Sequence, residues 1–132
     1  MNGKTANPSV RQAQDLCERL VDFAVRILAL VNKLPRNDVG SHIGKQLLRC
    51  ATSSGANYEE ARGAESPADF VHKLGVVSKE LKESRYWLKI ILRAKLLSPD
   101  QVACDLDECE QLCAIIGKSV VTARKPARLL DK

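Results

Sequence analysis

The chain has 132 residues, of which 45% are hydrophobic and 28% charged, with a formal net charge of +5. That balance suits one soluble domain with a single core and excludes a disordered chain. No stretch approaches the roughly 18 to 20 apolar residues of a membrane span, and the N-terminus lacks the apolar run of a secretory signal. Only 4% of the residues are aromatic, and so aliphatic a composition favours packed helices over sheets.

The positive charge is concentrated near the C-terminus, and residues 1–117 are nearly neutral. Asp131 is the only acidic residue after position 117. The basic residues in the same stretch are Lys118, Arg124, Lys125, Arg128 and Lys132. A basic tail of this kind either contacts nucleic acid or another acidic partner, or simply keeps the protein in solution. Both interpretations stay open at this point.

The cysteines predict reduced thiols in a cytoplasmic protein. They are five, an odd number, and none forms a Cys-x-x-Cys pair. Cys104, Cys109 and Cys113 are spaced by five and then four residues, with no nearby His, unlike the tightly paired ligands of structural zinc. We therefore expect the cysteines to pack as small core residues, and we expect no metal and no cofactor.

Helix-start signals divide the chain into four segments. Ser9 followed by Gln12 is a capping-box pattern, and the apolar periodicity that it opens is closed by Pro35. Ser-Pro pairs at 66–67 and 98–99 place Ser at an N-cap and Pro at the first helical position. The predicted helices cover about residues 10–34, 39–63, 67–96 and 99–123.

The links between these helices are short, and this predicts the fold. Helices joined by a few residues must lie antiparallel, so we expect an all-α, up-down-up-down four-helix bundle. No alternating strand pattern competes with it. Residues 1–123 form the single domain, and residues 124–132 form the basic C-terminal tail.

Two of the helices carry more apolar surface than one bundle needs. Apolar residues of the first helix, Val21 and Leu28 among them, cover an arc of roughly 180°, whereas a bundle helix needs little more than about 100°. In the fourth helix Ile115 lies outside even a wide arc. Because a monomer should not leave such surface in water, we expect identical copies to associate into a homo-oligomer. The alternative is that wide stripes simply mark well-covered helices.

The second helix becomes small and polar where a core helix usually carries Leu or Ile. In "RCATSSGANYEEAR", residues 49–62, a helical wheel turns Ser54, Asn57 and Ala61 inward. Small residues let a partner helix approach closely, and an inward Asn tends to fix helix register through its hydrogen bonds. The neighbouring flank forms a polar seam made of Arg49, Ser53, Asn57 and Glu60.

Three segments resemble the 23S rRNA-intervening-sequence proteins, usually called four-helix bundle proteins. They are "FAVRILALVNKLP", "QLLRCATSSGANYEEARG" and "DFVHKLGVVSKELKESRYWLKI", and the similarity covers about residues 16–97. Ser54 stands where the family usually has Ile, and Ala61 where it often has Gly. The matching positions are Gln46, Leu47, Arg49, Ser53, Asn57, Glu60, Glu80 and Tyr86.

The resemblance implies an all-α bundle that assembles into a ring, commonly a pentamer, with no established enzymatic activity. Related bundles encoded by diversity-generating retroelements are basic pentamers that bind nucleic acid and a reverse transcriptase. The family name records a gene location inside ribosomal RNA inserts and is not itself a sign of RNA binding.

Catalytic patterns are weak in this sequence. Neither His42 nor His72 has a Glu three residues before it, as the Glu-x-x-His motif of di-metal bundles requires. Arg36-Asn37…His42 superficially resembles the motif of the HEPN ribonucleases, in which Arg stabilises phosphate charge and His transfers a proton. In that family the motif belongs to a helix, whereas here it spans the link after Pro35.

We therefore predict a non-catalytic, homo-oligomeric helical scaffold that binds RNA, DNA or a nucleoprotein, with no membrane partner and no small-molecule substrate. One alternative is a protein–protein adaptor that does not bind nucleic acid. Another is a metal-independent ribonuclease that uses Arg36 and His42. Nucleic acid would be held by electrostatic contacts whose strength falls steeply with salt. The residues expected to make them are Lys118, Arg124, Lys125 and Arg128.

We expect the polar seam to set helix register or subunit contact. Asn57→Leu should change oligomer size or stability and leave the protein helical, because an apolar group replaces one that must be hydrogen-bonded. Light scattering, thermal unfolding and circular dichroism measure these three properties. Unchanged size and stability would show that Asn57 has no structural role.

Overall fold

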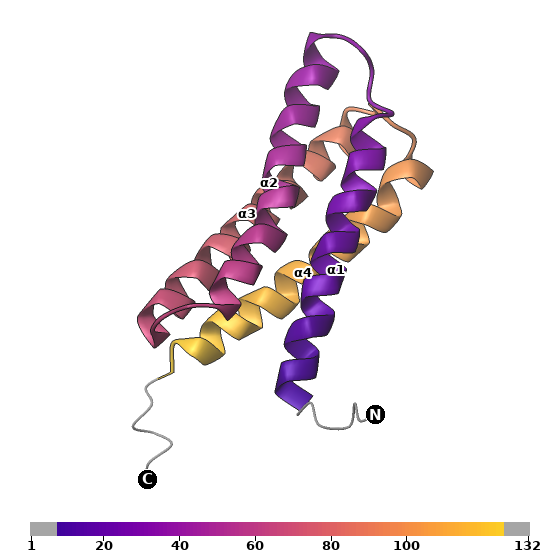
Figure 1. The fold of residues 1–132 in the computed structure, drawn as a ribbon. Helices are drawn as coiled ribbons and strands as arrows, with labels where there is room; N and C mark the ends of the chain where they lie inside the picture. The colour runs from indigo at the N-terminus through magenta and orange to yellow at the C-terminus, as the bar shows by residue number, and fades with distance from the viewer. Residues whose placement is uncertain (1–7, 126–132) are drawn as a thin grey trace.

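The computed structural model describes residues 8–125, which form four α-helices and contain no strand (Figure 1). The all-α prediction is confirmed for this part of the chain. Residues 1–7 and 126–132 lie outside the described residues, and with them the predicted contact residue Arg128. The helices are α1 Pro8–Val31, α2 Asp38–Arg62, α3 Pro67–Arg93 and α4 Pro99–Ala123.

The starts of α3 and α4 lie where the Ser-Pro pairs predicted them. The Asp69 N–H donates to Ser66 Oγ at 3.1 Å, which caps α3. At the start of α4 the Ser98 N–H donates to Gln101 Oε1 at 3.0 Å. Each bond satisfies a backbone donor that has no partner inside its own helix, so local side chains determine where these helices begin.

The predicted bounds of α1 are shifted at both ends. α1 begins at Pro8, so Ser9 belongs to the first turn and does not precede the helix. The helix ends at Val31, before the predicted end at Leu34. The reason is a tighter turn: the Leu34 N–H donates to the Val31 carbonyl at 3.1 Å, which closes the helix just before Pro35.

The predicted end of α3 is also too late. The helix ends at Arg93 because Lys95 has a φ of 57° and turns the chain into the left-handed region. The Leu96 N–H then donates back to the Ile91 carbonyl at 3.1 Å. Many helices end with this arrangement, and the residue in the left-handed position is usually a glycine. A lysine there gives no such signal in the sequence.

The helices pack as a bundle in which each one contacts two others. α2 packs between α1 and α3, and α4 packs between α3 and α1, whereas the backbones of the diagonal pairs do not approach closely. The interface between α1 and α4 is the smallest of the four. Figure 1 shows these two helices diverging toward the end at which α1 begins and α4 ends.

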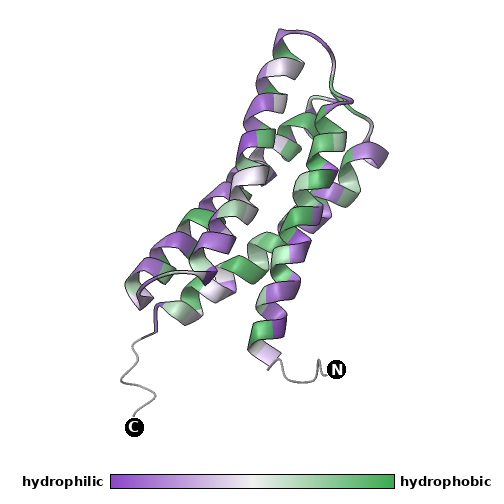
Figure 2. Ribbon diagram, in the orientation of Figure 1, coloured by the Kyte–Doolittle hydropathy of each residue, from purple (hydrophilic) through white to green (hydrophobic). Residues whose placement is uncertain are grey.

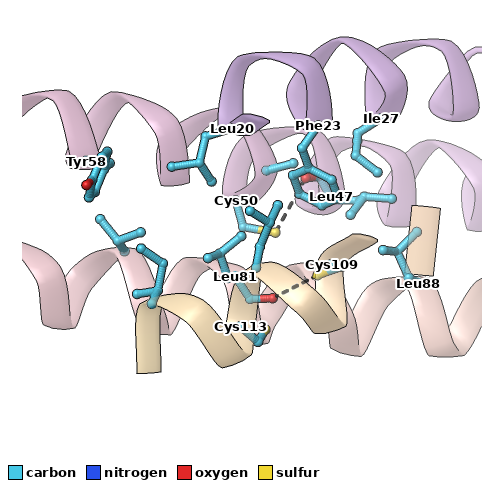
Figure 3. Close-up of a cluster of buried hydrophobic side chains, with 14 of the residues drawn as sticks. Leu20, Phe23, Ile27, Leu47, Cys50, Tyr58, Leu81, Leu88, Cys109 and Cys113 are labelled. Atoms are coloured by element: carbon cyan, nitrogen blue, oxygen red, sulfur yellow. Dashed lines mark hydrogen bonds between the residues drawn. The ribbon is translucent and has the colours of Figure 1, made fainter. Parts of the chain in front are cut away.

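All four helices contribute to one continuous apolar core, part of which is drawn in Figure 3. Burying one such Leu or Ile stabilises the fold by about 1.5–3 kcal/mol relative to leaving it exposed. Ser54 and Ser84 are also fully buried, and each donates to a carbonyl of its own helix. The largest buried side chains include Leu20, Phe23, Ile27, Leu47, Leu74, Leu81, Leu88, Ile91, Leu112 and Ile116.

Four of the five cysteines are buried and fill small spaces in this core, whereas Cys104 is exposed, so the prediction of a core position was wrong for Cys104. Cys50 Sγ donates to the Leu47 carbonyl and Cys109 Sγ to the Leu81 carbonyl, both at 3.4 Å (Figure 3). Burial raises the pKa of Cys50, and the hydrogen bond with Cys113, together with burial, raises the pKa of Cys109. Both groups are therefore protonated at neutral pH and act as small apolar side chains.

Gly40 should not tolerate a side chain. A Cβ at this position would collide with the carbonyl oxygen of Pro35, so the link before α2 would have to move. We expect Gly40→Ala to lower the free energy of unfolding by about 2 kcal/mol or more, measured by urea denaturation. Gly75→Ala is the matched control: a Cβ there meets no atom within 4 Å, and the change should stabilise α3 by up to about 1 kcal/mol. Equal effects would contradict this packing.

Candidate assembly and nucleic-acid interfaces

The polar seam lies along the contact between α2 and α3. Arg49 donates to Glu80 at 3.4 Å and to Glu83 at 2.6 Å. Six residues beyond the buried Ser54, Glu60 pairs with Lys73 at 3.4 Å. Arg49, Glu60 and Glu80 therefore all belong to ion pairs that join two helices of the same chain. The remaining exposure of Arg49 and Glu60 leaves both side chains in contact with solvent.

Asn57 does not take the inward position that the helical wheel predicted. Ser54 and Ala61 are buried, but Asn57 is only half-buried, at the edge of the α2–α3 contact. Its Nδ2 donates to the Ser53 carbonyl at 2.9 Å, within α2. The described structure thus shows an amide satisfied by its own helix. For Asn57 to set subunit contact, its side chain would have to meet a second copy of the chain.

Glu83 and Trp87 also take part in these contacts around Arg49, and neither was among the residues predicted for the polar seam. Glu83 accepts from Trp87 Nε1 at 3.2 Å in addition to Arg49, and the hydrogen bond from Arg49 lowers the pKa of Glu83. The spacing contained the signal, since residues three and four apart lie on one helix face. Glu83 is three residues after Glu80 and four before Trp87. Tyr86 is 57% exposed, and its ring meets the Trp87 ring edge-on at 5.1 Å.

Arg36 and His42 have different neighbours. The His42 ring meets the Trp87 ring edge-on, with 5.8 Å between centroids, on the side of α2 that faces α3. Arg36 lines a hollow of about 520 Å³ at the α1–α2 link, and His42 does not line it. A ribonuclease would need both groups at one phosphate, and this arrangement does not favour that alternative.

The C-terminal part of α4 and the residues that follow it form a basic end. Lys118, Arg124 and Lys125 are all exposed. Residues 111–125 contain no Asp or Glu, so no acid within this stretch offsets their charge. Within the described residues no ion pair is formed by any of these three side chains. Their charges are available to an external anion.

The outward side of α1 carries an apolar ridge, formed by Val21, Val25 and Leu28. These side chains are 49%, 57% and 44% exposed, and they follow one another at helical spacings of four and three. Figure 2 shows the run of apolar residues to which they belong in the second half of α1. Val21 and Leu28 belong to the surplus apolar surface that the sequence predicted for this helix, and Val25 adds to it. In α4, Ile115 is half-buried, whereas Val121 is 63% exposed.

A groove lies between α1 and α4, where the two helices diverge. Its volume is about 660 Å³. Beyond it the helices are held together by ion pairs, Arg19 with Glu108 at 2.9 Å and Arg26 with Asp105 at 2.7 Å. Its lining combines apolar side chains from all four helices with polar groups at the rim. Those used below are Leu16, Tyr58, Phe70, Ile115, Lys118 and Ser119.

Residues 8–125 contain no group of three or more His, Cys, Asp or Glu side chains placed to hold a metal ion. No helix in the same range is long and apolar enough to cross a membrane. What these residues present is a four-helix bundle with an apolar ridge, an open groove and a basic end, and these are surfaces for contact with other molecules.

Comparison with known proteins agrees with the four-helix fold. The family model of the 23S rRNA-intervening sequence protein matches residues 12–118, and the chain belongs to that family. A solved structure of similar fold is a protein of unknown function from the S23 ribosomal protein family of Bacteroides thetaiotaomicron VPI-5482. It is 31% identical, with a TM-score of 0.74, over 80% of this chain and 97% of its own. No curated protein matches the chain.

Glu83 should make stability depend on pH. Because Arg49 lowers the pKa of Glu83 below the unfolded value of about 4.3, its stabilisation is fully present above that pH and is lost as pH falls through the folded pKa. Solvent screens this pair, so Glu83→Gln should cost about 0.5 kcal/mol at neutral pH. The difference from wild type should vanish near pH 3 in urea unfolding.

Glu65→Gln is the control for this measurement, because Glu65 is exposed and its carboxylate forms no ion pair within residues 8–125. It should leave stability unchanged at both pH values. A Glu83→Gln variant as stable as wild type at neutral pH would show that the Arg49–Glu83 pair contributes nothing to the stability of the fold.

Proposed function

We propose that the chain is a non-catalytic scaffold that assembles into a homo-oligomeric ring, most simply a pentamer, and binds nucleic acid or a nucleoprotein. The observation that carries the assembly is the apolar ridge, whose three side chains are each at least 44% exposed. Removing apolar surface from water contributes about 25 cal/mol per Å², so covering the ridge with a second copy is favourable. We also place the protein in the cytoplasm, because its five cysteines are free and thiols stay reduced in that compartment.

An up-down-up-down order of the helices is part of this proposal. Between α2 and α3, Arg49 pairs with Glu83 whereas the later Glu60 pairs with the earlier Lys73. Between α1 and α4, Arg19 pairs with Glu108 whereas the later Arg26 pairs with the earlier Asp105. In both helix pairs, residue numbers rise along one helix as they fall along the other, which supports an antiparallel arrangement of α2 with α3 and of α1 with α4.

The basic end of α4 supports nucleic acid as the ligand. Lys118, Arg124 and Lys125 are exposed, and the tail adds Arg128 outside the described residues. One tail makes a weak contact, but a ring presents several copies, and binding through several linked sites is much tighter than through one. Such contacts go to phosphates and are tolerant of sequence.

The adaptor alternative draws on the near-neutral body of the chain, residues 1–117. In this case the ring would recruit another protein without nucleic acid. Recovery of the partner after nuclease treatment distinguishes the two functions, because a protein contact survives the treatment and a contact bridged by RNA or DNA does not.

Removing the tail charges should weaken nucleic-acid binding and its salt dependence. In the triple variant Arg124→Gln, Lys125→Gln, Arg128→Gln, the slope of log K against log salt should become less steep by about 2 to 3 per chain engaged, since each lost phosphate contact contributes roughly 0.7–0.9. Fluorescence anisotropy with a labelled single-stranded RNA and a labelled DNA duplex, at several salt concentrations, measures this slope.

The control removes the same charge from α3, through Lys79→Gln, Lys82→Gln and Lys89→Gln. It should retain the wild-type slope, because these residues lie away from the basic end. Equal binding by the tail variant and the wild type would exclude the tail as the contact. Equal losses in both variants would mean that only net charge matters.

A further inference from the structure

The α1–α4 groove has an apolar floor that residues 8–125 leave partly uncovered. Tyr58 from α2 and Phe70 from α3 reach it from behind, between Leu16 of α1 and Ile115 of α4. The floor is accessible because α1 and α4 separate beyond the Arg19–Glu108 ion pair. The opening is therefore a place where the bundle core can be reached from outside.

The apolar ridge has the dimensions to fill this groove. From Val21 to Leu28 the ridge spans about 10 Å along the helix axis, at 1.5 Å per residue. From Ile115 to Ala123, the α4 wall of the groove spans about 12 Å by the same measure. A helix laid in the groove would pack three outward side chains against the exposed floor.

The charges beside the ridge and along the α4 wall of the groove are opposite. Glu18 and Asp22 are exposed next to the ridge, and neither forms an ion pair within the described range. The α4 wall of the groove carries Lys118 and is followed by Arg124, in a stretch without acidic residues. The α1 wall carries one acid, Asp15, and one base, Arg19, which is paired with Glu108. A ridge in the groove would thus bring unpaired acids near unpaired bases. The C-terminal tail is a poorer occupant because it is itself basic.

We propose that the apolar ridge of one copy packs into the α1–α4 groove of the next copy. The inference rests on the proposed assembly and names its interface. Ridge and groove occupy different faces of one chain, so the contact is head-to-tail, and each copy gives one ridge and receives one. A head-to-tail contact forms a ring when its rotation closes, whereas a self-complementary patch would stop at two copies.

Two variants and their mixture test this pairing. Val25→Glu places a charge on the ridge and leaves the groove intact, and Ser119→Glu places one in the groove and leaves the ridge intact. Light scattering at micromolar concentration should give the mass of a single copy for each. Their equimolar mixture should give a two-copy particle, because one intact ridge and one intact groove remain to pair.

Val39→Glu is the matched control, an exposed valine at the start of α2 away from both surfaces. It should keep the wild-type mass, and circular dichroism should show all variants helical. Should Val25→Glu lose helicity, Leu28→Glu replaces it as the ridge variant. A chain ended after Lys125 should also keep the wild-type mass.

Several results would overturn the inference. A wild-type assembly that persists in both Glu variants, or a mixture that stays as single copies, would leave the proposed ring standing but place its interface elsewhere. Loss of assembly in the shortened chain would show that residues 126–132 are needed for the contact between copies, and that the tail and not the ridge occupies the groove. A wild-type protein with the mass of one copy would contradict the proposed assembly and this interface together.

Discussion

The central constraint on this molecule is that α1 has more apolar surface than its two neighbours, α2 and α4, cover. Its inner side chains, such as Phe23 and Ile27, are fully buried, whereas Val21, Val25 and Leu28 remain 44–57% exposed on the opposite side. About half of each of these side chains is not covered by packing within residues 8–125. Because their exposure to water is unfavourable, an apolar ridge along a helix of a bundle favours association. The divergence of α1 from α4 leaves an open groove of similar length, so one chain carries both surfaces of the proposed contact.

The buried apolar core drives the four helices together, and polar contacts fix how they are arranged. Arg49 ties α2 to the acids of α3, and Arg19 and Arg26 tie α1 to α4. Such solvent-exposed pairs each stabilise the fold by at most about 1 kcal/mol, far less than the buried leucines, but they are specific in their geometry. They select one arrangement among the many that aliphatic helices could adopt. Beyond the Arg19–Glu108 pair the two helices diverge, and a groove opens between them.

Local signals in the sequence were enough to predict the helices. Ser66 and Gln101 cap α3 and α4 where the Ser-Pro pairs predicted, and the apolar periodicity identified the core. Lys95 ends α3 through a backbone conformation that sequence does not reveal in a lysine. The polar seam was predicted as a face, but the partner of Asn57 was not, since a wheel does not show that its amide reaches back to Ser53. The groove depends on the angle between α1 and α4, a tertiary property with no local signature.

The exposure of Val25 in solution tests the account most directly. A single cysteine at this position, through Val25→Cys in a Cys104→Ser background, changes little in size or polarity, and the other four thiols are buried. The rate of its alkylation in the native protein is compared with the rate in urea. If copies cover the ridge, the native rate should be lower by at least about tenfold, as for any site that must open by roughly 1.4 kcal/mol or more before reacting. A native rate close to the unfolded rate would show that the ridge faces water and would contradict assembly through α1.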